Sequence, residues 1–126
     1  MKRRLIALAL VVACSGCGTA QVYDGARRSA DEVARITGDL RINAGSPLTL
    51  VLRAVDNTPL TIGQNAVDVL PGKHSLLVDC RIAENESVSR HSVEVEVSAG
   101  RHYKLVAETG PGLRECTQVT LQTVDL

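Results

Sequence analysis

The sequence predicts an all-β fold, a small antiparallel β-sandwich of about seven or eight short strands. Three observations support this prediction: apolar and polar residues alternate with period two, turn residues recur about every ten positions, and no long amphipathic helical pattern separates the alternating runs. The clearest alternation is the run VEVEV at 93–97, which is typical of a half-buried strand. We therefore expect one β-sandwich domain over residues 29–126.

The expected strands lie between turn signals. Residues 48–56 are apolar on both faces, so we expect a central strand covered on both sides. After the Pro71-Gly72 turn, His74 falls in line with three apolar core positions, which predicts a core strand. The full set of expected strands is 39–43, 48–56, 60–62, 66–70, 73–82, 88–99, 101–108 and 116–124.

A short helical segment is expected before the first strand. Ser29 and Glu32 have the spacing of a capping box, and Thr37-Gly38 provides a stop. The sequence therefore predicts one or two helical turns over 30–36. An extended edge segment is the alternative.

The N-terminus has the features of a lipoprotein signal peptide, which we assign to residues 1–16. A basic start precedes the nine apolar residues LIALALVVA at 5–13, a run too short to span a bilayer. Small residues and a cysteine follow. We favour Cys17 as the acylated residue, with Cys14 as the alternative and a secretory signal without lipid as a further one. Residues 17–28 are then expected to form a flexible tether.

Acylation of this cysteine predicts attachment to the bacterial outer membrane on its periplasmic face. Two or three acyl chains are enough for stable anchoring. The residue after the acylated cysteine is Gly18, or Ser15 in the alternative, and neither is the Asp that signals retention in the inner membrane. The expected partner is therefore the membrane.

Cys80 and Cys116 remain as a pair once Cys17 carries the lipid. An exported chain meets an oxidising compartment, so we expect a disulfide between them. Two buried free thiols are the alternative.

Composition argues against several classes of function. Removal of Lys2, Arg3 and Arg4 lowers the formal charge from +0 to −3, which disfavours nucleic acid as a partner. Phe and Trp are absent, so few aromatic rings are available to stack on bases or sugars. The three histidines lack the spacing of metal ligands, so we expect no metal and no cofactor.

No catalytic motif is found. A Gly-Xaa-Ser-Xaa-Gly elbow is absent. The carboxylate pairs Glu84/Glu86 and Glu94/Glu96 have the pattern of solvated side chains. We expect no catalytic residue, and interpret His74 as a structural histidine of the core or its rim, whose ring bonds a backbone carbonyl near the Pro71-Gly72 turn.

Three loops offer another binding surface if they gather at one end of the sandwich. They are 57–61, 83–87 and 109–114. Loops at the end of a scaffold often carry binding residues.

Several short motifs resemble those of small, uncharacterised lipoproteins of Gram-negative bacteria. They include the signal with its cysteine, the LPGKH turn at 70–74 and the AGRHY turn at 99–103. The two turns, with Pro71, Gly72, His74, Gly100 and Tyr103 as their structural motif, are similar to those of PEGA-like β-domains. The resemblance implies an Ig-like sandwich attached to a membrane, and it implies no catalytic residue.

We therefore expect a non-enzymatic lipoprotein with a structural or protein-interaction role in the cell envelope, and an unidentified envelope protein is its candidate partner. The alternative is a periplasmic inhibitor or a small-ligand-binding module.

Overall fold

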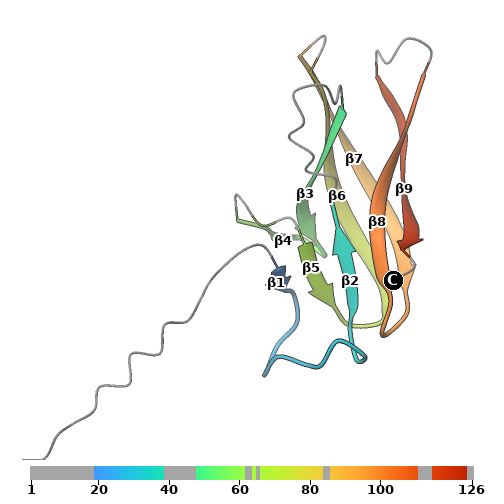
Figure 1. Ribbon diagram of the computed structural model, residues 1–126. Helices are drawn as coiled ribbons and strands as arrows, with labels where there is room; N and C mark the ends of the chain where they lie inside the picture. The colour runs from blue at the N-terminus through green and yellow to red at the C-terminus, as the bar shows by residue number, and fades with distance from the viewer. Residues whose placement is uncertain are drawn as a thin grey trace, which may run out of the picture.

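The protein is a two-layer β-sandwich in the computed structural model, which describes residues 19–38, 48–61, 64, 66–83, 86–110 and 115–124 (Figure 1). This confirms the predicted all-β sandwich. The described residues form nine strands rather than seven or eight. The strands are β1 (Thr19–Gln21), β2 (Ala34–Thr37), β3 (Leu48–Val55), β4 (Thr58–Pro59), β5 (Ala66–Val69), β6 (Gly72–Ile82), β7 (Ser87–Val97), β8 (His102–Thr109) and β9 (Cys116–Val124).

The strands form two sheets. A five-stranded sheet has the order β1-β5-β2-β8-β9, and a four-stranded sheet has the order β4-β3-β6-β7. The four-stranded sheet is antiparallel, as predicted. The five-stranded sheet is mixed, because β1 pairs with β5 in parallel and β2 pairs with β8 in parallel. The prediction of a purely antiparallel sandwich is therefore wrong for this sheet.

The core lies between the two sheets and is almost entirely aliphatic. Alternate residues of β6, among them Leu76, Val78 and Cys80, are buried against the other layer, as the alternation predicted. Tyr103 is the one aromatic residue of this core cluster.

The predicted helical turns over 30–36 are wrong. The Glu32 N–H donates to the Ser29 carbonyl at 3.0 Å, so the capping sequence makes only a single turn. The chain then enters β2, because sheet pairing captures its backbone: Arg35 N–H donates to the Arg101 carbonyl at 3.0 Å. Ala34 and Ile36 are both fully buried, the period-two pattern of a strand. β2 lies inside the sheet rather than at an edge.

The predicted tether also needs correction in its described part. Thr19–Gln21 forms β1, which pairs with β5 in the register Thr19↔Ala66. The Gln21 side chain then closes the following turn by donating to the Gly25 carbonyl at 2.8 Å. Part of the segment expected to be flexible therefore belongs to the domain.

The alternation of β3 changes within the strand. Leu50 and Leu52 are buried as expected, but an irregularity between Leu52 and Ala54 makes Val55, and not Ala54, the next core residue. A bulge of this kind shifts the side chains by one position. The short strand expected over 60–62 is found earlier, as β4. The strand expected over 39–43 lies outside the described residues.

Among the described residues, no helix has the length and apolar character needed to cross a membrane.

Candidate functional site

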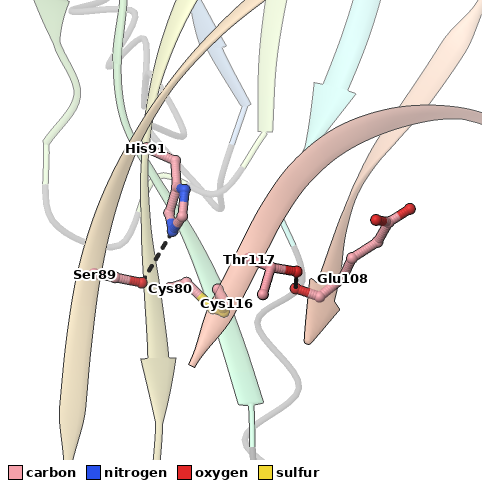
Figure 2. The surroundings of a disulfide bond; sticks show 6 residues. All are labelled: Cys80, Ser89, His91, Glu108, Cys116 and Thr117. Atoms are coloured by element: carbon pink, nitrogen blue, oxygen red, sulfur yellow. Dashed lines mark hydrogen bonds between the residues drawn. A yellow bond between two sulfur atoms is a disulfide. The ribbon is translucent and has the colours of Figure 1, made fainter. Parts of the chain in front are cut away.

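The disulfide joins the two sheets. Cys80 lies in β6 and Cys116 begins β9, with 6.5 Å between their Cα atoms. Figure 2 shows the bond between the layers, with His91 and Ser89 of β7 on one side and Thr117 of β9 on the other. The His91 ring and the Ser89 hydroxyl are 3.0 Å apart. The predicted disulfide is therefore present and links a central strand to an edge strand.

Tyr103 makes a second link between the layers. Its ring belongs to β8 of the five-stranded sheet and is 9% exposed. Its hydroxyl accepts a hydrogen bond of 2.9 Å from the Ser98 N–H, just after β7 of the other sheet. This resembles the tyrosine corner of Ig-like sandwiches.

Gly100 allows the tight turn before Tyr103. Its φ of +76° favours glycine, and a Cβ there would lie 3.6 Å from the Asp31 carbonyl oxygen. The Gly100 N–H donates to the Val33 carbonyl at 2.8 Å. The turn therefore ties the start of β2 to the corner between the sheets.

His74 has a structural position at the β5–β6 turn, which lies at the same end of the sandwich as the β7–β8 turn because Gly72 pairs with Val97. Its Nε2 lies 2.6 Å from the Leu70 carbonyl, which confirms the predicted backbone contact, and its Nδ1 lies 2.5 Å from Asp56 Oδ2. The ring therefore connects the Leu70 backbone to the Asp56 side chain. Gly72, with a φ of +126°, lets the chain turn between Leu70 and His74.

Asp56 is held on both sides. Burial opposes its charge, but the Ser75 N–H, which donates at 2.8 Å, and the His74 ring outweigh that effect and lower the pKa of Asp56. The cluster joins the β3–β4 turn to the β5–β6 turn. Because its groups already bond one another and the backbone, it has the features of a structural clamp.

A groove lies between the edge strands β7 and β9, and we take it as the candidate site. Its volume is about 460 Å³, within the range of small-molecule sites. Apolar side chains form part of its wall, with polar residues at its rim. The lining residues are Val93, Glu94, Val95, Glu96, Tyr103, Gln118, Val119, Thr120, Leu121 and Thr123.

The two links between the sheets frame this groove. The disulfide begins β9 two residues before Gln118, and Tyr103 lies at the other end beside Thr123, its partner in the sheet. In Figure 1 β7 and β9 lie on the same flank of the sandwich. The walls are therefore fixed at both ends.

The structure does not gather the three predicted loops. The connections after β6 and β8 leave the same end, because Cys80 near the end of β6 is bonded to Cys116 after the β8 turn. The turn after β3 lies at the other end, where the Asp56 N–H donates to the Ser75 carbonyl at 2.8 Å. The alternative of one cluster of all three loops is therefore wrong.

The remaining predicted residues have separate places. Pro71 is exposed at its turn. His91 and His102 lie on different sheets, and within the described residues no group of three metal-ligating side chains converges. Cys17 and Cys14 lie outside the described residues.

The comparisons with known proteins give no relative. No family model matches the chain, and neither a curated protein nor a solved structure is significantly similar to it.

The sequence alone did not reveal the groove. It predicted β7 and β9 as strands, but it carries no signal that both are sheet edges on the same flank. One feature of the sequence sets β9 apart from most edge strands. Edge strands usually carry charged residues that discourage pairing, whereas Cys116–Val124 contains none.

Proposed function

We propose that this protein is a lipid-anchored lipoprotein of the bacterial outer membrane, with a non-catalytic β-sandwich that binds another protein of the cell envelope. The signal sequence and its cysteines support the anchor. The disulfide between Cys80 and Cys116 supports an oxidising compartment. The PEGA-like turns around Pro71 and Gly100 fit an Ig-like module.

The observation that carries the binding role is the groove between β7 and β9. Among the described residues β7 and β9 are the outer strands of their sheets, and edge strands pair readily with an added strand. The two links between the sheets hold the walls in place, so a partner meets a preformed surface. Preorganisation of this kind lowers the entropic cost of binding.

A catalytic role has less support. The groove brings together Glu94 and Glu96 from a single strand with Gln and Thr side chains, without a nucleophile and base in contact among the lining residues. The closest histidine and carboxylate, His74 and Asp56, bond the backbone at another place in the fold. These positions suit binding better than chemistry.

Palmitate labelling in a bacterial host tests the anchor. We expect the wild type and Cys14→Ser to incorporate the label and to be found in the outer-membrane fraction. We expect Cys17→Ser to incorporate no label. Label that survives in Cys17→Ser and disappears in Cys14→Ser moves the anchor to Cys14. If neither variant affects labelling, or the wild type takes up none, the proposed anchoring is wrong.

A further inference from the structure

The edge of β9 lacks the features that normally keep an edge strand from pairing. Its nine residues, CTQVTLQTV, include no charge, proline or glycine. Its pairing with β8 is regular from Gln118 to Val124, and the one irregularity lies at the Cys116 end. Proteins usually protect such edges with lysine, proline or a bulge. A regular, neutral edge of this length is therefore suited to receive another strand.

The groove shows which side chains an added strand would meet. Val119 and Leu121 point between the layers, opposite Ala107 and Leu105 of β8. Val93 and Val95 of β7 are half-buried on the facing wall. A strand beside β9 would therefore place every second side chain against a partly apolar surface.

The negative charge beside the groove favours a partner that carries positive charge. Glu94 and Glu96 are exposed and line the groove, and the ion pairs of the described residues leave both carboxylates out. A cation from a partner would meet two carboxylates there. A second copy of this chain, paired through β9, would instead bring the same two carboxylates of each copy toward the same flank, which costs energy by repulsion.

From these observations, and resting on the proposed binding role, we infer that β9 accepts an extended strand of a partner protein whose groove-facing side chains are apolar at the centre and basic at the ends. The backbone bonds of β9 supply affinity. The valine-lined wall and the Glu94 and Glu96 carboxylates supply selectivity.

Synthetic peptides test this inference with the full chain purified in detergent. The probe is Lys-Thr-Val-Thr-Val-Thr-Lys, in which Lys and Val share one face. The controls are the same peptide with Glu at both ends and one with Pro at the centre. We expect only the Lys peptide to bind by fluorescence anisotropy, and its binding to slow hydrogen exchange of the β9 amides, because those amides gain partners.

A charge reversal sharpens the test. In the double variant Glu94→Lys/Glu96→Lys we expect the Lys peptide to bind about tenfold more weakly and the Glu peptide to bind in its place. The matched control Glu108→Lys changes an exposed glutamate of β8 outside the groove lining, and we expect affinity within about twofold of wild type.

Several outcomes would overturn the inference. They are equal binding of the Lys and Glu peptides, no binding of either, protection of β7 amides instead of β9, and a dimer in solution whose β9 amides are already protected. The proposed anchor fails separately, by loss of palmitate from a protein that still binds the peptide. A protein that incorporates palmitate but does not bind the peptide contradicts only the inference that β9 accepts a strand.

Discussion

Each sheet has a buried aspartate on its outer face, covered by arginine. Asp79 of β6 is 2% exposed, and Asp68 of β5 is 5% exposed. Arg53 and Arg90 close over Asp79 from the two neighbouring strands at 2.7 and 2.9 Å. Arg35 bonds Asp68 at 2.8 Å. A buried carboxylate is costly without such partners, so these pairs allow the outer faces to hold charge close to the backbone.

Asp79→Asn should destabilise the protein by about 1–2 kcal/mol at neutral pH, because the charge-assisted hydrogen bonds from Arg53 and Arg90 weaken, while solvent screens the partly exposed arginines. The Arg90 hydrogen bond, opposed by burial and aided by Arg53, lowers the pKa of Asp79 below its ordinary value of 3.8. The contribution of a carboxylate with a lowered pKa is present above the unfolded pKa and is lost as pH falls through the folded one. Urea unfolding should show the difference between wild type and variant shrinking toward about pH 2.

The matched control is Asp24→Asn, which changes an exposed aspartate in the turn after β1. We expect a change within about 0.5 kcal/mol. A difference between wild type and Asp79→Asn that stays constant from neutral to acidic pH would mean that packing, and not the carboxylate charge, causes the loss.

Elements whose local pattern agrees with their tertiary environment were predictable. The range of β9 matches the predicted strand, and β5 and β6 differ from theirs by one residue each. β2 failed because a capping sequence and a strand pattern share the same residues, and pairing with the Gly100 turn decides between them. The irregularity of β3 between Leu52 and Ala54 was not predictable, since residues 48–56 are apolar on both faces and the sequence does not show where the core-facing positions shift.

Tyr103→Phe should destabilise the domain by about 1 kcal/mol. The ring stays in the core, but the Ser98 N–H loses its acceptor at the corner between β7 and β8. Tyr23→Phe is a close control, because the Tyr23 hydroxyl also accepts a backbone N–H at 2.9 Å, that of Arg28, but at an exposed position where water replaces it. Thermal unfolding should therefore shift for Tyr103→Phe and hardly for Tyr23→Phe. Equal shifts would contradict the role of the corner.

The arrangement of the whole molecule depends on contacts between distant segments, and only some of these could be predicted from the sequence. The disulfide was predictable, because Cys80 and Cys116 remained as a pair once the two N-terminal cysteines were assigned to the expected signal. The order of the strands was not, since the parallel pairs β1/β5 and β2/β8 join segments far apart in the sequence. The groove follows from that order, because it exists only where β7 and β9 are both edges. For this reason its residues, Tyr103 excepted, were not among the predicted site residues.

The disulfide should contribute up to about 4 kcal/mol of stability, because it closes a loop of about 37 residues in the unfolded chain. Cys80 and Cys116 are both buried in the core, so the double variant Cys80→Ala/Cys116→Ala also loses some packing. Reduction of the wild type by dithiothreitol removes the bond but keeps both sulfurs, and the comparison separates the two effects.

Urea unfolding of the oxidised, reduced and double-variant proteins makes this comparison, and mass spectrometry of unreduced peptides checks that Cys80 is linked to Cys116. We expect reduction to account for most of the loss. The same bond lies at one end of the groove and holds β9 against β6. Reduction in the absence of urea, where the sheets remain folded, should therefore also weaken binding of the Lys peptide. If reduction lowers stability but leaves peptide affinity unchanged, the disulfide serves the fold alone, and Tyr103 with the rest of the core is enough to position β9.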